Sequence, residues 1–396
     1  MIKQVIIFAG GKGERMMPLS SNKPKCLIKL SKKPFIEYLL KQIENLKVEE
    51  VIILVGYKSK KILDYLKLKK YNFKIITKNL DEKFETSKRI LNIKKLLKKE
   101  FMIMYSDVYC EHDILESYKQ FKKNNFDGQI TVFSDKFKFL KRSNIRTKNK
   151  LVFKYSKKII PNFRNTGIDI GYSFFKKKIF QKKFNQNLSF QNLYYKSLIS
   201  KHKLSFYETD VRYTSLSRIS ELNKAKNYFT KKYIFLDRDG VINHKPKKLE
   251  YVDNINKFKW KNEFLKFIKN LKTKNTEFIV ISNQAGVARK KLTKNILNKI
   301  NILINRKLKK YRLKISAFYY CTHHWNENCM CRKPKPGLIL LAQNSKLIKF
   351  SNSIFIGDSE TDEQAAKNLN INFFKVVNKE SFDRIKIKIS KKKFLN

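Results

Sequence analysis

Long apolar runs are absent from this chain of 396 residues, and none approaches the roughly 20 residues of a membrane-spanning helix. The apolar start, Val5–Ala9, is too short for a signal peptide and lacks a cleavage site. These absences predict a cytoplasmic protein without a membrane partner. Apolar residues still make up 42% of the chain, which excludes a disordered protein and indicates two or three domains.

Acidic residues are also few, 33 against 89 basic ones, which leaves a net charge of +56. Taken alone, that charge indicates a polyanion partner. Only 13 of the basic residues are Arg, however, and Lys, Asn, Ile, Phe and Tyr are abundant while Gly and Pro are scarce. An AT-rich coding bias gives this composition, and the lysines are dispersed rather than gathered in one arm. We therefore expect no nucleic-acid partner, with a basic nucleic-acid-binding protein as an open alternative.

Short β-branched runs alternate with helical stretches up to about residue 135, which predicts βαβ units around a mostly parallel sheet. The alternation weakens over 135–215 and restarts near residue 233. We therefore expect two doubly wound α/β domains, residues 1–228 and 232–385, with a linker at 229–231 and a basic tail at 386–396. The predicted strands are Val5–Phe8, Val51–Val55, Phe73–Thr77, Phe101–Tyr105, Gln129–Phe133, Tyr233–Leu236, Phe278–Ile281, Ile315–Tyr320, Ile354–Ile356 and Phe373–Val377.

A hydrophobic strand that ends in Asp-x-Asp-Gly carries the strongest chemical signal of the second domain, at Asp237 to Gly240. Chemistry in open α/β sheets sits at the carboxyl ends of the strands. Asp237 can therefore attack a phosphoryl group and form an aspartyl-phosphate. Asp239, two residues on, can protonate the leaving oxygen and later activate water.

Three later segments supply the partners that such a reaction needs. Ser282 ends a strand with a hydroxyl, Lys333 places a cation before a helix, and Asp358 ends another strand with a carboxylate. Mg²⁺ prefers one or two carboxylates together with phosphate oxygens. Four elements in this order predict a magnesium-dependent phosphatase.

This half resembles the haloacid dehalogenase superfamily over residues 232–385 and, within it, the histidinol-phosphate and heptose-bisphosphate phosphatases. The resemblance implies that Asp237 is the nucleophile and Asp239 the acid/base. Ser282 and Lys333 would hold the phosphoryl group. It further implies a Mg²⁺ site at Asp237, Asp239 and Asp358 and substrate contacts from Asn283, Arg289 and Arg332.

Three of the five cysteines cluster with a histidine between residues 321 and 331. Thiolates and imidazole in this number suit tetrahedral Zn²⁺. In a cytosolic protein such a cluster indicates a metal rather than disulfides. The four ligands, Cys321, His323, Cys329 and Cys331, leave no open position, so the predicted zinc is structural.

The choice of phosphate ester is open in this half alone. The segment Gly286-Val287-Ala288-Arg289 is similar to the heptose-bisphosphate branch. The five residues between His323 and Cys329 are more typical of the histidinol-phosphate branch. The two observations conflict, so the choice between the two substrates depends on the first half of the chain.

The first strand of the chain runs into a glycine loop, Gly10-Gly11-Lys12-Gly13, which Arg15 and Lys25 follow. Glycines let backbone N–H groups close around a triphosphate, and the two cations can neutralise phosphates. The loop is not a Walker motif, because no Gly-Lys-Ser/Thr follows.

With the Lys-Pro-Lys and Lys-Pro-Phe segments beyond it, this pattern resembles sugar-1-phosphate nucleotidyltransferases over residues 1–228. In that family a sugar phosphate attacks the α-phosphorus of a nucleotide and releases pyrophosphate. The resemblance implies Asp107 and Asp210 as Mg²⁺ ligands and Asn165 and Gly167 in the sugar-binding turn. The chain departs from the family at Ser106, where Gly is usual, and at Glu85–Lys88, where the base-contacting loop lacks its glycines.

Heptose activation needs a phosphatase and then a nucleotidyltransferase, and families for both steps meet in this sequence. We therefore predict a bifunctional enzyme that removes the 7-phosphate of D-glycero-D-manno-heptose 1,7-bisphosphate and transfers a nucleotide, with GTP as the expected donor, to heptose 1-phosphate. Its partners would be sugar phosphates and a nucleoside triphosphate, and self-association stays open. The main alternative is a phosphatase, for a heptose bisphosphate or histidinol phosphate, with a degenerate nucleotidyltransferase module.

Overall fold

The computed structural model describes residues 1–137, 143–160, 166–181, 186–247, 249–391 and 394. The chain divides into two compact units, Met1–Lys226 and Asn227–Asn396. The division falls inside helix α6 (Leu222–Thr230), so the expected linker at 229–231 is largely helical. Phe229 in this helix is buried, and its carbonyl accepts from the Asn352 amide of the second unit (3.0 Å).

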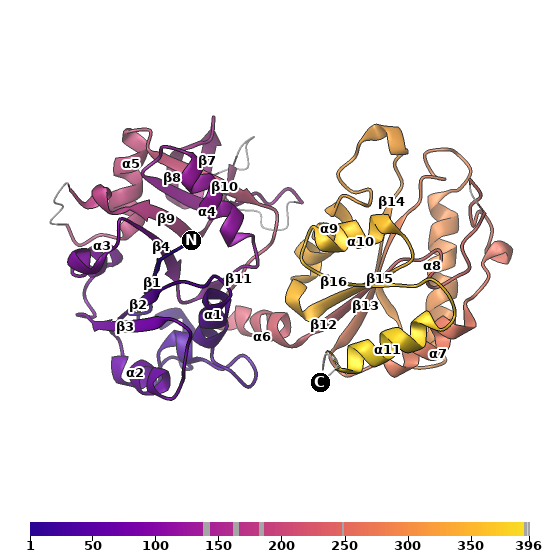
Figure 1. Ribbon diagram of the computed structural model, residues 1–396, viewed down its shortest axis with the longest axis horizontal. Helices are drawn as coiled ribbons and strands as arrows, with labels where there is room; N and C mark the ends of the chain where they lie inside the picture. The colour runs from indigo at the N-terminus through magenta and orange to yellow at the C-terminus, as the bar shows by residue number, and fades with distance from the viewer. Residues whose placement is uncertain (138–142, 161–165, 182–185, 248, 392–393, 395–396) are drawn as a thin grey trace. The chain divides into compact units, whose positions relative to one another are not determined.

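The first unit is built on a nine-stranded mixed sheet in the order β3-β2-β1-β4-β9-β6-β10-β8-β7 (Figure 1). Its strands are β1 (Gln4–Phe8), β2 (Glu50–Val55), β3 (Lys74–Asn79), β4 (Glu100–Tyr105), β6 (Gly128–Phe133), β7 (Ser143–Lys148), β8 (Leu151–Ile160), β9 (Thr166–Lys176) and β10 (Leu204–Thr209), and β5 (Val108–Tyr109) pairs separately with β11 (Thr214–Ser215). Its α-helices before α6 are α1 (Phe35–Glu44), α2 (Ser59–Lys67), α3 (Thr86–Leu91), α4 (Ile114–Lys123) and α5 (Lys196–Ser200).

The strands at the start of this unit follow the sequence pattern closely. Strand β1 is buried along its whole length and pairs in parallel with β2 and β4. A strand buried on both faces reads as a continuous apolar run, as β1 does. The carboxyl ends of β1 and β4 therefore meet at one edge, where the glycine loop begins.

The expectation of a mostly parallel sheet holds only for part of the first unit. The stretch that lacks alternation contains β7, β8 and β9, and their pairings with one another and with β4, β6 and β10 are antiparallel. β9 is almost continuously buried between β4 and β6, so its side chains do not alternate in polarity. This is why the period-2 signal fails there.

The second unit contains a five-stranded parallel sheet in the order β14-β13-β12-β15-β16. Its strands are β12 (Lys232–Leu236), β13 (Thr276–Asn283), β14 (Ile315–Cys321), β15 (Ser353–Gly357) and β16 (Asn372–Lys375). Its helices are α7 (Asn262–Asn270), α8 (Lys294–Lys309), α9 (Gly337–Lys346), α10 (Glu360–Lys367) and α11 (Ser381–Lys391). The doubly wound α/β fold expected for this half is confirmed.

The strand order of the second unit reverses at β12, which lies between β13 and β15. Ligands of open α/β sheets bind at such a switch point, outside the carboxyl ends of the strands. On one face, Ile234 and Leu236 of β12 join a core with α7, α8 and α11. Figure 1 shows α9 and α10 on the other side of the sheet from α7 and α11.

The end of the chain corrects the expectation of a tail from residue 386. Helix α11 continues to Lys391, and Ile385 and Ile389 are buried in the core of the second unit. Residues 386–391 therefore belong to the domain. No helix in the described part of the chain combines the length and apolarity needed to cross a bilayer.

Candidate active sites and metal centre

Asp237 follows β12 directly and packs against a buried ammonium group. Its backbone N–H donates to the carbonyl of Ile356 (3.0 Å), so the residue is still held beside β15. Lys333 Nζ lies 3.0 Å from Asp237 Oδ1 and 2.5 Å from Asp362 Oδ1, and it donates to the carbonyl of Ile281 (3.0 Å). Lys333 is only 4% exposed, so the structure brings these two predicted residues together in a fixed geometry.

Three carboxylates at this edge, Asp237, Asp358 and Asp362, have oxygens within 4.8 Å of one another. Burial raises the pKa of Asp237 to about 7, Lys333 opposes this, and the neighbouring carboxylates add to the rise. Lys333 alone therefore does not balance the negative charge of the three carboxylates. This donor set fits Mg²⁺, and because Asp362 is engaged elsewhere, Asp237 and Asp358 are the residues that would hold it.

Asp362 is a site residue that the sequence analysis did not assign. It is fully buried in the first turn of α10, and its carboxylate accepts the backbone N–H groups of Asp358 (3.2 Å) and Ser359 (3.1 Å). Ser359 and Asp362 form a capping box. The Ser-x-x-Asp spacing is the signal that could have found it, and its role here is to hold Asp358 and Lys333 in place.

The Asp239 carboxylate is held by three neighbouring side chains, and its assignment as a Mg²⁺ ligand stays a prediction. Arg238 Nη2 lies 2.8 Å from Asp239 Oδ2, and the amide groups of Asn243 (2.8 Å) and Gln284 (2.7 Å) also donate to Asp239. Burial raises the pKa of Asp239, but Arg238 and the amides outweigh burial, so the pKa lies below its usual value. Arg238 itself is completely buried, and its guanidinium donates to both oxygens of this carboxylate.

The two residues that end β13 differ in what they contact. Ser282 is 2% exposed, and its hydroxyl accepts from Gln284 Nε2 (3.2 Å). The Asn283 amide bonds the backbone of Lys333 on both sides, donating to its carbonyl and accepting from its N–H (both 3.1 Å). Asn283, predicted to touch substrate, therefore positions the Lys333 backbone in this structure.

The two predicted substrate-binding arginines lie near the zinc-type cluster. Arg289 donates to the Tyr251 hydroxyl (3.1 Å) and lies over the Trp325 ring, 5.1 Å from its centroid. Arg332 follows the last cysteine directly, and its Nη1 is buried without a hydrogen-bond partner among the described residues. Their contact with substrate stays a prediction.

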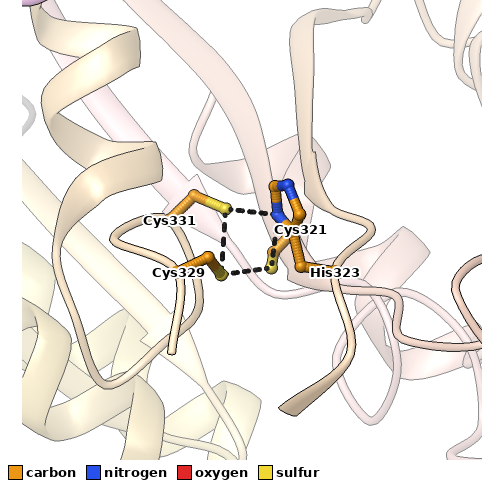
Figure 2. Close-up of side chains that lie close together, drawn as sticks. All are labelled: Cys321, His323, Cys329 and Cys331. Carbon is orange, nitrogen blue, oxygen red and sulfur yellow. Dashed lines mark hydrogen bonds between the residues drawn. The ribbon is translucent and has the colours of Figure 1, made fainter. Parts of the chain in front are cut away.

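The four predicted zinc ligands converge, as Figure 2 shows. Cys321 Sγ lies 3.5 Å from Cys329 Sγ and 3.8 Å from His323 Nδ1. Cys331 Sγ lies 3.4 Å from Cys329 Sγ and 3.1 Å from His323 Nδ1. Three sulfurs and one ring nitrogen at these separations form a compact four-point set, and it fits tetrahedral Zn²⁺.

The glycine loop of the first unit is braced by a residue that the motif does not contain. A Cβ on Gly10 would lie 2.1 Å from Arg89 Nη1, whereas a Cβ on Gly11 would meet open space. Gly13 adopts a φ of 69°, which favours glycine, before the short turn that carries exposed Arg15. The only indication of this Arg89 contact in the sequence was that arginine is rare in the chain.

Arg89 belongs to α3 and is 4% exposed. Its guanidinium donates to the carbonyls of Val55 (3.1 Å), Phe84 (2.7 Å) and Asp81 (2.9 Å). These bonds tie the end of β2 and the segment before α3 to the same group that borders Gly10. The segment without the usual glycines is therefore held by a buried arginine.

The two acidic residues predicted to bind Mg²⁺ in the first unit are each held by their own lysine. Lys25 Nζ lies 2.5 Å from Asp107 Oδ2, with side chains 19% and 20% exposed. Lys136 Nζ lies 2.9 Å from Asp210 Oδ2, and the Ser134 hydroxyl also donates to Asp210. Lys25 and Asp107 are thus brought together, while a metal site shared by Asp107 and Asp210 stays a prediction.

Of the predicted sugar-binding turn, Asn165 lies outside the described residues. Gly167 is the second residue of β9, where a Cβ would lie 2.3 Å from Val132 Cγ1 and 2.8 Å from the Phe133 carbonyl oxygen. Close packing on β6 therefore accounts for a glycine at this position. Its contact with a sugar stays a prediction.

Comparisons with known proteins divide the chain in the same way as the structure. The family model described as nucleotidyl transferase matches residues 4–138, and the model described as polynucleotide kinase 3 phosphatase matches residues 232–382. D-glycero-alpha-D-manno-heptose-1,7-bisphosphate 7-phosphatase of Campylobacter jejuni is 36% identical over 149 residues, 38% of this chain and 84% of that protein. D-glycero-beta-D-manno-heptose-1,7-bisphosphate 7-phosphatase of Helicobacter pylori J99 is 36% identical over 143 residues, 36% of this chain and 80% of that protein.

Among solved structures, HddC from Yersinia pseudotuberculosis matches with 24% identity and a TM-score of 0.47. The match covers 58% of this chain and all of that one.

Proposed function

The chain belongs to the family of D-glycero-D-manno-heptose-1,7-bisphosphate 7-phosphatases through its second unit, and we propose that it hydrolyses the 7-phosphate of such a bisphosphate and activates the product with a nucleotide. It is an enzyme with a phosphatase domain and a nucleotidyltransferase domain. The observation that carries the proposal is this pairing in one chain. A heptose 1-phosphate, which the first reaction releases, is the class of acceptor that a sugar-1-phosphate nucleotidyltransferase uses.

In the phosphatase domain, the Asp237 carboxylate attacks the phosphorus, and the bond to the sugar oxygen breaks. The Lys333 ammonium, 3.0 Å from Asp237, and the Ser282 hydroxyl hold the phosphoryl oxygens. Mg²⁺, held by Asp237 and Asp358, would neutralise charge on the transferred group.

Asp239 serves the second step in particular. Arg238 and the two amides favour its ionised form, which is the form that takes a proton from water. The water oxygen bonds to phosphorus as the bond to the Asp237 oxygen breaks, which releases inorganic phosphate and restores the carboxylate. In the first step Asp239 has to be protonated, because it supplies a proton to the leaving sugar oxygen.

In the nucleotidyltransferase domain, the backbone of the glycine loop and the cations Arg15 and Lys25 bind the triphosphate. The sugar phosphate attacks the α-phosphorus, and pyrophosphate leaves. Asp107 and Asp210 are the proposed Mg²⁺ ligands, and GTP is the proposed nucleotide. Because nucleoside triphosphates are cytoplasmic, we place both steps in the cytoplasm, where the product would serve lipopolysaccharide biosynthesis.

The cluster of Cys321, His323, Cys329 and Cys331 holds a structural Zn²⁺ in this proposal. All four ligand positions come from the protein, so no position is left for substrate. The metal would hold together the loop between β14 and α9, which also carries Lys333.

A phosphate-release screen tests the phosphatase proposal with heptose 1α,7-bisphosphate, its 1β anomer and histidinol phosphate. We expect turnover of at least one heptose bisphosphate to exceed that of histidinol phosphate by more than about tenfold, a difference in transition-state stabilisation of roughly 1.4 kcal/mol. The relatives are named for both anomers, so the screen also determines the anomer. Preferential release from histidinol phosphate would contradict the proposed substrate.

A pyrophosphate-release panel tests the second step, with GTP, ATP, CTP, UTP and dTTP against heptose 1-phosphate and other sugar 1-phosphates. We expect the highest rate with GTP and heptose 1-phosphate. Turnover with another nucleotide would overturn the choice of GTP and retain the transferase. Nucleotide binding without pyrophosphate from any pair would support a degenerate module instead.

A further inference from the structure

The proposed Mg²⁺ site of the phosphatase has two lysines of opposite character. Lys333 is 4% exposed and is fixed by Asp237, Asp362 and a backbone carbonyl. Lys245 Nζ lies 2.8 Å from Asp358 Oδ2, but its side chain is 60% exposed, against 12% for Asp358. Lys333 is therefore part of the interior, whereas Lys245 covers the site from solvent.

The backbone that carries Lys245 is anchored, so only its side chain is free to move. The His244 N–H donates to the carbonyl of Lys259 (2.8 Å), and Asn243 Nδ2 donates to the carbonyl of His244 (2.8 Å). These two hydrogen bonds fix the backbone at His244, one residue before Lys245. The ammonium thus reaches Asp358 from a fixed starting point.

Asp358 has little room for two cations. On one side a Cβ at Gly240 would lie 2.2 Å from Asp358 Oδ2, the same oxygen that contacts Lys245. On the other side the Lys245 ammonium, 2.8 Å from this oxygen, already brings a positive charge. A divalent cation bound to Asp237 and Asp358 would lie close to the Lys245 ammonium, because both cations would contact the Asp358 carboxylate.

We propose that Lys245 is a displaceable counter-ion of the metal site: its ammonium holds Asp358 while no metal is bound and has to leave when a divalent cation binds. The proposal rests on the proposed function, which places Mg²⁺ at Asp237 and Asp358. Lys245 therefore weakens Mg²⁺ binding, since the metal has to break an ion pair before it binds. The exposure of Lys245 makes that exchange possible, while buried Lys333 stays in place.

The test is calorimetric titration of Mg²⁺ into the full-length protein in the absence of substrate, after Mg²⁺ has been removed by dialysis. Lys245→Gln should tighten Mg²⁺ binding about fivefold, at the upper end for an ion pair with one exposed partner. Lys245→Glu should tighten it further, and Lys245→Arg should retain the wild-type affinity. The binding heat that disappears in Asp358→Asn belongs to this site, which distinguishes it from any other Mg²⁺ site in the chain.

Lys247→Gln is the matched control, because this exposed lysine lies two residues along the same loop. It removes the same charge without removing the contact with Asp358. An affinity in Lys245→Gln equal to wild type, or an equal change in Lys247→Gln, overturns the proposal and leaves the metal site intact. Mg²⁺ binding that Asp358→Asn does not alter overturns the metal site and the counter-ion together.

Discussion

In the second unit, direct contacts link the four residues of the site in series: Asp237, Lys333, Asp362 and Asp358. In the first unit, Asp107 and Asp210 follow β4 and β10, and each is paired with a different lysine. The phosphatase sheet is parallel and places its strand ends at one edge. The nucleotidyltransferase sheet is mixed: β1, β4 and β10 run in one direction, and β9, which carries Gly167, runs in the other.

The difference concerns how much of each site is assembled by the protein alone. The phosphatase residues hold one another in the interior, where a fixed geometry costs no rearrangement during the reaction. The nucleotidyltransferase residues lie beside an open glycine loop, and a nucleotide with its metal would complete them. Both sites nevertheless share one device, a lysine on a proposed metal-binding carboxylate: Lys25 on Asp107 and Lys245 on Asp358.

The largest expected effect separates the two halves at the nucleophile. Asp237→Asn should reduce phosphate release below about one hundredth of the wild-type rate, because an amide does not form the aspartyl-phosphate. Pyrophosphate release should stay near wild type. Asp253→Asn, at a partly exposed aspartate that pairs with Lys257, is the control that should alter neither rate. Higher residual phosphatase activity in Asp237→Asn would reject Asp237 as the nucleophile.

The reverse separation starts from Asp107. Asp107→Ala should lower pyrophosphate release roughly a hundredfold, since electrostatic stabilisation of the developing charge supplies several kcal/mol. Phosphate release should persist in the same variant. Exposed Asp64 on α2, changed to Ala, provides the control, and an Asp107→Ala enzyme with normal pyrophosphate release would remove Asp107 from the site.

Zinc offers a comparison in stability rather than in activity. Metal analysis should find about one Zn²⁺ per chain, and Cys329→Ser should lose it, because structural zinc binding is coupled to folding. A loss of about 3 kcal/mol would lower the melting temperature of the second unit by roughly 10 °C and leave the first unit unchanged. Cys26→Ala, at a buried cysteine outside the cluster, should keep its zinc, and a zinc-free protein of full stability would contradict the assignment.

The smallest expected effect is a pH dependence confined to the first unit, at His112. This residue is 5% exposed, its ring meets Tyr172 at 4.9 Å, and neither ring nitrogen has a hydrogen-bond partner among the described residues. Burial lowers the pKa of His112 to about 3, so the unfolded chain takes up this proton first as the pH falls below about 6.5. The folded state therefore loses stability from about pH 6.5 downward.

His112→Phe should remove this loss, so the difference in unfolding free energy between variant and wild type should grow as the pH falls. The limit is about 1.4 kcal/mol per pH unit. Denaturant unfolding of the first unit between pH 7 and 5 measures it. His202→Asn is the control, because His202 is exposed and has a φ of 54°, which Asn tolerates. A pH-independent difference for His112→Phe would show that His112 is not the titrating group.

Prediction from sequence worked best where chemistry and strand ends coincide. The zinc-type cluster spans only residues 321–331, so its four ligands were readable from spacing alone. Asp237 and Lys333 are 96 positions apart, yet both follow motifs whose place in a parallel sheet is known, and the structure brings them within 3.0 Å. The antiparallel strands β7, β8 and β9 were not predicted; β9 in particular is almost continuously buried and lacks the alternation that identifies a strand.

The contacts that the sequence analysis missed all depend on side-chain partners. Arg238 holds the Asp239 carboxylate and the Asn283 amide holds the Lys333 backbone, and neither contact was predicted. Arg89, Asp362 and Lys245 act through contacts with residues up to 113 positions away. Local spacing does not encode such partners.

The amino-acid sequence by itself determined the two α/β domains and predicted the nucleophile and the zinc-type cluster, because these follow from periodicity and from residue spacing over short distances. Only the tertiary structure decided which carboxylates lie together, which are held by cations and which lysine is buried or exposed. Those properties depend on burial and on the few ångströms between side chains from different strands. Electrostatic interactions depend steeply on both.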